Sequence, residues 1–281
     1  MQIRVSIVCL IYKSVGWLRF VCDQLYKYTD LKDKEFYFVA NDASEEVLTY
    51  LRDNNVPHYV WRNSPEQRRE WYINNVYRAW NFGAQQARGD FIVFINSDMA
   101  FTPGWLENLW NAYAGSNCLT SRLVESGKLR SGPFGVENNF GRHFKAFRES
   151  EFQDFALSIK EKKIENGGLF MPLLIAKKDF DSVGGYPEGN AVPETDLFHP
   201  KIARKGEPCL SGDAVLMEKL CFRGIIHQTV FDSVVYHFQM GEMDDVGPMF
   251  RIVALFRQIS GSLSYTSRTV RTIARNVLSR S

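Results

Sequence analysis

The sequence has little of what marks secreted, membrane-spanning or zinc-binding proteins. Its five cysteines are odd in number, lie far apart and never form a CxxC pair, which argues against both a zinc site and a disulfide framework. Nowhere do about 18 apolar residues follow one another, the length that a membrane-spanning helix needs. The apolar run near the start is too short for a secretory leader. We therefore expect a cytoplasmic protein with reduced cysteines.

Common phosphate-binding loops are also absent. The chain contains neither a GxGxxG segment nor a GxxxxGKS or GxxxxGKT segment, which disfavours dinucleotide-binding and P-loop proteins. The net charge is only +2, from 34 basic and 32 acidic residues, so the composition indicates no nucleic-acid partner. The charge is uneven, however, because residues 246–281 contain six arginines and no lysine, aspartate or glutamate.

Short apolar runs alternate with segments of helical periodicity over roughly the first 100 residues. This alternation is typical of βαβ units, so we predict an α/β fold with a mostly parallel central sheet flanked by helices. Strands are expected at residues 5–12, 35–40, 57–61, 91–95, 119–124 and 230–237, and helices at 14–28, 45–52, 65–87, 103–113 and 214–223. One polar helix is expected within residues 125–165.

We predict one domain at residues 1–245, with a nucleotide-binding half at about 1–124 and an acceptor half at about 125–245, followed by a basic amphipathic tail at 246–281. A helical face of the tail would carry Met249, Ile252, Val253, Phe256 and Ile259. Such a face beside arginines suits an anionic lipid surface, so peripheral membrane contact is one expectation. Packing on the domain and closure over a bound diphosphate are the alternatives.

Two aspartates stand where predicted strands end. Asp42 follows the second strand and Asp98 follows the fourth. Ligands of open parallel sheets bind at the carboxyl ends of the strands, and two carboxylates at one sheet edge suit a divalent cation or ribose hydroxyl groups. Such residues can equally form turns or helix caps.

A series of motifs in this order resembles the inverting glycosyltransferases of family 2, which have the GT-A fold. The matching segments are residues 5–13 in the first strand, Asn41-Asp42-Ala43-Ser44, Asn81-Phe82-Gly83, Ala87-Arg88-Gly89-Asp90, the DxD-like Asn96-Ser97-Asp98, Val183-Gly184-Gly185-Tyr186, Gly212-Asp213 with Leu216, Lys219, Leu220 and Gly224, and Tyr236-His237. The resemblance extends to about Gly241 and implies a fold of the nucleotide-diphospho-sugar transferase type.

On the donor side, the resemblance implies that Asp98 holds a divalent metal, Mn²⁺ or Mg²⁺, and that His237 completes the metal or diphosphate site. Asn96 departs from the first aspartate of the usual motif and is expected to reach the ribose or a metal-bound water. Asp42 would contact the nucleoside, with Tyr12 packed nearby, and Asn81 is also expected at the donor site. Locally, Asp42 could instead form an Asx-turn, and His237 could be a satisfied half-buried side chain.

On the acceptor side, inversion needs a base that takes the proton of the attacking hydroxyl group. Asp213 is the candidate, because the residues after it keep the spacing of the family; capping of the following helix is its alternative role. Asp196, in Glu194-Thr195-Asp196-Leu197, is a rival. Gly184, Gly185 and Tyr186 resemble the loop beside the acceptor, although a glycine pair can simply form a turn.

The sequence thus predicts metal-assisted transfer of a sugar, with inversion, from a UDP-, GDP- or dTDP-sugar to a hydroxyl group of a glycan or lipid-linked glycan. A retaining glycosyltransferase of the same fold is the nearest alternative. A catalytically silent protein that binds nucleotides or glycans is another, because Asn96 already departs from the motif. A sugar-nucleotide pyrophosphorylase is disfavoured, since residues 14–19 lack the glycine-rich loop of those enzymes.

Overall fold

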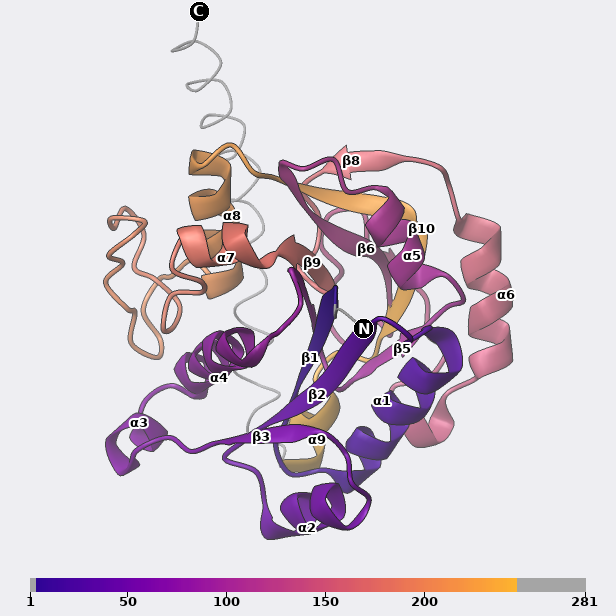
Figure 1. Ribbon diagram of the computed structural model, residues 1–281, viewed down its shortest axis with the longest axis horizontal. Coiled ribbons are helices and arrows are strands. Elements are labelled where there is room, and N and C mark those ends of the chain that lie inside the picture. Colours follow the sequence, from indigo (N-terminus) through magenta and orange to yellow (C-terminus); the bar gives the residue numbers. More distant parts are fainter. Residues whose placement is uncertain (1–3, 247–281) are drawn as a thin grey trace, which may run out of the picture.

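A computed structural model describes residues 4–246 of the chain, so the predicted basic tail lies outside the described residues apart from its first position. Helices pack on both sides of one twisted sheet (Figure 1). No helix in residues 4–246 is both long and apolar enough to cross a bilayer. The predicted α/β architecture with a mostly parallel central sheet is confirmed.

The described sheet has ten strands, and eight of them follow one another in the order β3-β2-β1-β4-β9-β6-β10-β5. The first four are parallel neighbours, whereas β9 runs antiparallel between β4 and β6. The strands are β1 (Val5–Ile11), β2 (Lys34–Asn41), β3 (His58–Trp61), β4 (Phe91–Ile95), β5 (Met99–Phe101), β6 (Asn117–Glu125), β7 (Val136–Glu137), β8 (Ile164–Asn166), β9 (Leu173–Ala176) and β10 (Ile226–His237). Strand β7 pairs with β6, and β8 with β10.

The helices largely follow the predicted periodicity. They are α1 (Val15–Tyr28), α2 (Glu45–Asp53), α3 (Pro65–Arg69), α4 (Tyr72–Gln86), α5 (Trp105–Asn111), α6 (Glu149–Ile159), α7 (Lys177–Ser182), α8 (Gly212–Phe222) and α9 (Gly241–Val246), with a 3-10 turn at Phe144–Ala146. The single helix predicted at 65–87 is wrong. It is broken at Glu70 and Trp71, whose backbone is extended, and the break buries the Trp71 side chain.

Helix α4 packs tightly on strands β1 and β2, whose carboxyl ends carry predicted donor residues. A Cβ atom at Gly83 would lie 2.7 Å from Val8 Cγ1 and 2.9 Å from Val39 Cγ2, so only glycine lets the helix approach β1 and β2 this closely. The Tyr37 hydroxyl group donates to the Gly83 carbonyl oxygen over 2.8 Å. Helix α1 starts shortly after β1. Its N-cap is Ser14, whose Oγ accepts from the Trp17 amide.

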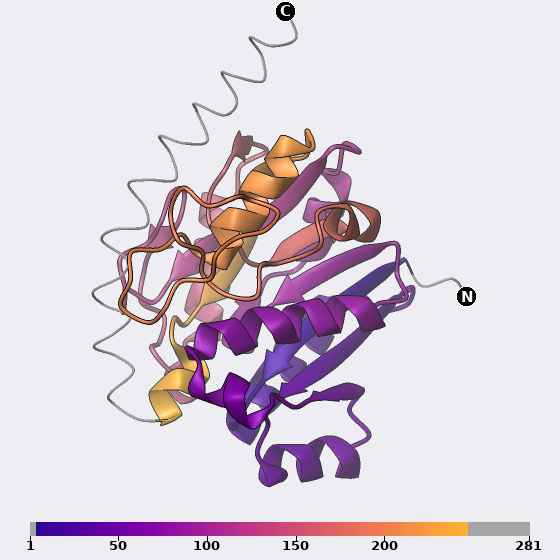
Figure 2. The same cartoon turned by 90° about the vertical axis from the view of Figure 1, so that its left-hand side faces the viewer.

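A second, aromatic core lies beside the end of β10. It contains Trp17, Phe140, Phe152, Tyr236 and Phe238, and the Tyr236 hydroxyl group donates to the Gly141 carbonyl oxygen within it. These contacts hold the residues on either side of His237. Seen from the side, α9 lies at the end of the sheet where β1 leads into α1 (Figure 2).

Candidate functional site

Asp98 and His237 lie side by side although 139 positions separate them in the chain. Strand β10 runs antiparallel to β5 and pairs His237 with Met99, the residue after Asp98. His237 Nε2 is 3.5 Å from Asp98 Oδ1, and His237 Nδ1 is 3.0 Å from Glu125 Oε1. Both carboxylate side chains are buried. The result is an Asp98–His237–Glu125 row across three strand ends.

The two carboxylates change the ionisation of His237. Burial by itself lowers the pKa of this imidazole, but Asp98 and Glu125 outweigh burial and raise the pKa to about 10. Burial likewise raises the pKa of Asp98, and His237 together with the Gly241 N–H reverses this and leaves the pKa of Asp98 below its ordinary value. His237 is therefore a half-buried imidazolium between two carboxylates.

These residues fit a divalent metal only as a partial set. In residues 4–246 no group of three or more His, Cys, Asp or Glu side chains is placed to hold a metal ion. Asp98 and His237 do supply one oxygen and one nitrogen, and Glu125 would orient the imidazole through its other nitrogen, as carboxylates beside metal-bound histidines commonly do. A metal would have to replace the Nε2 proton and take its remaining ligands from substrate oxygens and water.

Asp42, at the end of β2, has a left-handed backbone with φ of 47°. Its carboxylate accepts from the Asn63 amide (3.2 Å) and the Asn63 Nδ2 (2.6 Å), and from Arg68 Nη2 (2.8 Å). These partners come from distant segments, so the carboxylate does not form the local Asx-turn. Sequence reasoning missed Asn63 and Arg68, because nothing in their local pattern shows that β3 and α3 return to the end of β2.

Tyr12 and Asn96 lie at the carboxyl ends of β1 and β4 and are both half-buried. The Tyr12 backbone amide donates to Glu242 Oε2 over 3.0 Å. Sequence reasoning missed Glu242, although it directly follows Gly241, where the resemblance ends. The carboxylate of Glu242 also reaches Ser97 Oγ at 3.5 Å, so α9 touches the DxD-like motif.

Asp213, the predicted base, is the second residue of α8. The helix is capped by Ser211, whose Oγ accepts from the Ala214 amide, and the Asp213 carboxylate instead accepts a 2.9 Å hydrogen bond from the Tyr77 hydroxyl group of α4. Burial raises the pKa of Asp213 to about 6, and the bond from Tyr77 moderates the rise. Tyr77 looks like a core residue in the sequence, so its hydroxyl contact was not predicted.

The rival Asp196 has a different environment. Its side chain is exposed, and its Oδ1 accepts from the backbone amides of Phe198 and His199. These hydrogen bonds lower the pKa of Asp196 below its ordinary value. A weakly basic carboxylate that closes its own loop is poorly suited to taking a proton from a hydroxyl group.

The predicted acceptor loop is held by two residues of α4, Tyr77 and Asn81. Gly184 and Gly185 have φ of 69° and 65°, which glycine adopts readily, and Tyr186 stacks on Tyr77 with ring centroids 5.3 Å apart. Asn81 accepts from the Tyr186 amide and donates to the Tyr186 carbonyl oxygen, each over 2.9 Å. Both ends of the Asn81 amide group thus bind the backbone of the predicted acceptor loop.

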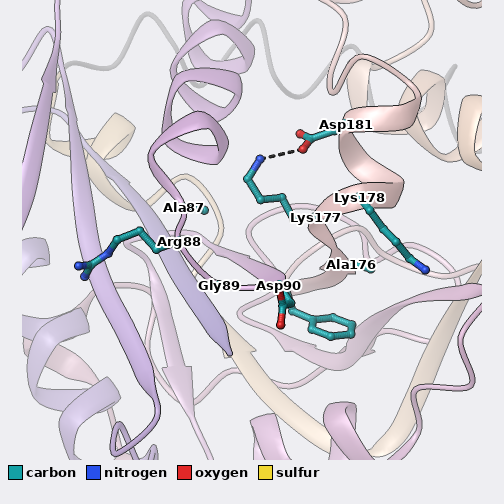
Figure 3. A pocket seen from close by; sticks show the side chains of 9 residues that line it. Ala87, Arg88, Gly89, Asp90, Ala176, Lys177, Lys178 and Asp181 are labelled. Atoms are coloured by element: carbon teal, nitrogen blue, oxygen red, sulfur yellow. Dashed lines mark hydrogen bonds and ion pairs between the residues drawn. The ribbon is translucent and has the colours of Figure 1, made fainter. Parts of the chain in front are cut away.

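One pocket lies away from these residues. It measures about 460 Å³ and is lined by residues 87–91, 176–178 and 181, at the amino end of β4 (Figure 3). Its Lys177 pairs with Asp181, and Arg88 pairs with Glu35. Because parallel sheets bind ligands at the carboxyl ends of their strands, this pocket is not the candidate site.

Comparisons with known proteins agree with this geometry. A family model described as Glycosyl transferase family 2 matches residues 21–152, whereas no curated protein matches the chain in sequence. A crystal structure of GalNAc-T7 with UDP, GalNAc and Mn²⁺ matches with a TM-score of 0.53 and 17% identity, covering 84% of this chain and 44% of that chain. The crystal structure of S. aureus TarS 1-349 matches with a TM-score of 0.52 and 14% identity, covering 90% and 64% respectively.

At these identities the solved structures establish the fold alone. The present chain spans less than two thirds of the length of either one. The predicted relationship is nevertheless confirmed by the family match together with the fold. Residues 21–152 match the glycosyl transferase family 2 domain, and the described chain has the GT-A fold.

Proposed function

We propose that this protein transfers a sugar from a nucleoside-diphosphate sugar to a hydroxyl group, with inversion at the anomeric carbon. The observation that carries the proposal is Asp213, a half-buried carboxylate at the start of α8 with a pKa of about 6 and a hydroxyl partner in Tyr77. A general base works best when its pKa lies near the working pH. Asp213 therefore stands ionised at neutral pH while keeping useful basicity.

In the proposed reaction the acceptor oxygen forms a bond to the anomeric carbon as its proton passes to Asp213. The bond between that carbon and the diphosphate oxygen breaks on the opposite face. The loop at Gly184, Gly185 and Tyr186 would hold the acceptor beside Asp213, since Asn81 and Tyr77 fix its backbone and ring. A glycan or lipid-linked glycan is the proposed acceptor class.

The donor would lie across the carboxyl ends of β1, β2 and β4. Asp42, held in place by Asn63 and Arg68, would accept an N–H of the nucleobase or a ribose hydroxyl group, with Tyr12 and Asn96 beside it. Asp98 and His237 would hold Mn²⁺ or Mg²⁺. When bound, such a metal stabilises the negative charge of the leaving diphosphate.

A nucleotide panel tests the donor assignment. The chain is heated with UDP, GDP, dTDP or CMP, each with Mn²⁺ or with EDTA, and its unfolding is followed. A nucleotide at a hundred times its dissociation constant should stabilise the fold by about 2.7 kcal/mol. One nucleobase should give the largest shift, and only with metal. The absence of a shift with every nucleotide would contradict the proposal.

The alternatives are separated by products. A retaining enzyme would give the same anomeric configuration in product and donor, which proton NMR of the anomeric signal reports. A silent binding protein would bind nucleotide but release no diphosphate in the presence of any acceptor. We favour inversion because Asp213 has the position, the partner and the raised pKa of a base.

A further inference from the structure

Helix α9 lies against the predicted donor site. Its first residue, Gly241, donates its backbone N–H to Asp98 Oδ2 over 2.9 Å. A Cβ atom at Gly241 would lie 2.2 Å from Asp98 Cβ, so the backbone presses directly on this side chain. One carboxylate oxygen of Asp98, the predicted metal ligand, thus already accepts a hydrogen bond from the backbone of this chain.

The next residue, Glu242, binds the connection between β1 and α1. Its carboxylate accepts three backbone N–H groups, from Tyr12 at 3.0 Å, Lys13 at 2.9 Å and Ser14 at 2.7 Å. These N–H groups lie just before α1 begins at Val15, where the partial positive charge of the helix N-terminus also attracts anions. The carboxylate that accepts from them comes from about 230 positions away in the sequence.

Another acidic residue of α9, Asp245, also contacts the start of α1. Asp245 Oδ2 accepts from Trp17 Nε1 over 3.1 Å and lies 3.4 Å from Ser14 Oγ, while its other oxygen lies 3.5 Å from His143 Nε2. Glu242 and Asp245 therefore make most of their polar contacts with one short segment, residues 12–17. A pocket of about 290 Å³ opens beside it, lined by Lys13, Ser14, Glu242 and Asp245.

The placement of Glu242 is electrostatically costly. Glu242 is a half-buried carboxylate that lies 3.5 Å from Ser97 Oγ and so stands close to the Asp98 carboxylate. Two like charges at one sheet edge repel each other. A negatively charged donor would meet both of them, so a contact of this kind is more readily explained as exchangeable than as a permanent tie.

We propose that α9 is a displaceable strap, in which the Glu242 carboxylate stands in for an oxyanion of the donor nucleotide and must leave before the nucleotide binds. This inference rests on the proposed function, because it takes the edge formed by Tyr12, Ser97 and Asp98 as the donor site. Displacement frees four groups together: the backbone N–H groups of residues 12–14, just before α1, and the oxygen of Asp98 that accepts from Gly241. Nucleotide binding and release of the strap are then linked. Because the nucleotide binds only when the strap is open, its binding shifts the protein away from the closed state.

The linkage sets the size of the effect. A strap that is closed about nine tenths of the time weakens the apparent affinity for nucleotide about tenfold. Glu242→Gln keeps the size of the side chain and removes its charge, which favours the open state. Glu165→Gln is the matched control, because Glu165 is a carboxylate of β8 that pairs with Lys163 and does not touch the strap.

Calorimetric titration of the full 281-residue chain with UDP, GDP, dTDP and CMP in the presence of Mn²⁺ tests the proposal. We expect Glu242→Gln to bind the preferred nucleotide about tenfold more tightly than the unsubstituted chain, and Glu165→Gln to bind it with the same affinity as that chain. In the unsubstituted chain, hydrogen exchange of a peptide that includes Gly241 should speed up when nucleotide binds, because the amide loses Asp98. This second readout needs no variant.

Two results would overturn the strap. Equal or weaker nucleotide binding by Glu242→Gln would show that the carboxylate does not compete with nucleotide, and slower exchange at Gly241 with nucleotide would show that α9 closes over it. In either case the proposed function stands, since the nucleotide binds. Failure of all three proteins to bind any of the four nucleotides would instead remove the donor site, and the strap with it.

Discussion

At the scale of single residues, environment separates side chains that look alike in the sequence. Asp213 and Asp196 are both aspartates in loops or helix starts of the acceptor half. Burial raises the pKa of Asp213 to about 6, whereas backbone amides lower the pKa of the exposed Asp196. Asp213 can therefore act as a base at neutral pH, whereas Asp196 stabilises its own loop.

Asp213→Asn is expected to lower kcat by roughly a hundred- to ten-thousand-fold with little change in nucleotide affinity, because the amide keeps the shape of the side chain and loses its basicity. Steady-state kinetics and nucleotide titration on the same preparations measure both effects. If Asp196→Asn has this phenotype and Asp213→Asn does not, the assignment of the base is wrong.

The pH profile of kcat should rise through the pKa of Asp213, at about 6, because only the ionised carboxylate accepts a proton. The Tyr77 hydroxyl group stabilises that ionised form. Tyr77→Phe should therefore move the acidic limb to higher pH, by roughly one unit for the loss of one hydrogen bond to a charged group. A uniform drop in kcat with an unmoved limb would mean that Tyr77 only supports packing.

Raising the pKa of an acid on folding also has a cost in stability. The protonated form of Asp213 suits the fold, so its contribution is present below the unfolded pKa and is lost as pH rises through about 6. Asp213→Asn should consequently be more stable than the unsubstituted chain at pH 8, by on the order of 1 kcal/mol, and should lose this advantage near pH 4. Urea unfolding at the two pH values measures the difference.

Asp98→Ala should abolish metal-dependent stabilisation by nucleotide and abolish transfer. Asp98 is the buried carboxylate that shares its surroundings with His237, and no third His, Cys, Asp or Glu within residues 4–246 completes a metal cage with them. Thermal unfolding with UDP and Mn²⁺, together with a transfer assay, tests this. Full transfer by Asp98→Ala in the presence of EDTA would rule out the metal assignment.

At the scale of elements, close packing of α4 on the sheet sets the position of both Tyr77 and Asn81. Gly83 is the point of closest approach, where a Cβ atom would lie under 3.0 Å from Val8 and Val39 side chains. On helix propensity alone, glycine to alanine would stabilise an exposed helix by about 1 kcal/mol. Here the neighbouring side chains oppose that gain.

Gly83→Ala is therefore expected to destabilise the protein by about 1–3 kcal/mol through overpacking. Gln85→Ala, at an exposed position of the same helix, should change the free energy of unfolding by less than about 0.5 kcal/mol. Chemical denaturation of the two variants compares them directly. A stabilising Gly83→Ala would mean that α4 can move away from β1 and β2 without loss.

At the scale of the whole molecule, the net positive charge of the chain comes from its last 36 residues. Residues 246–281 carry six arginines and no acidic side chain, and we expect them to attract anionic lipid. Sedimentation with anionic vesicles should pellet the full chain more than a chain ending at Gly247, and added salt should weaken the difference, because charges more than about 10 Å apart are screened at 0.1 M. Equal pelleting at all salt concentrations would contradict membrane contact.

Much of the architecture followed from local patterns. The alternation of apolar runs and helical periodicity predicted the parallel strands around β1 and the helix that follows β1. The same reasoning joined α3 and α4 into one helix, because the periodic pattern continues through Trp71 while burial of its side chain requires an extended backbone there. Periodicity reports which face is buried, and does not report where the chain turns to bury a single large residue.

For the candidate site, the sequence by itself determined which polar residues end the strands, since Asp42, Asp98 and His237 stand where apolar runs stop. Only the tertiary structure decided their partners. Glu125 beside His237, Tyr77 beside Asp213 and Glu242 on the start of α1 join positions 112, 136 and about 230 residues apart. Such contacts depend on sheet order and on the path of the chain after β10, and these arise from packing of the whole domain, so no local pattern of residues encodes them.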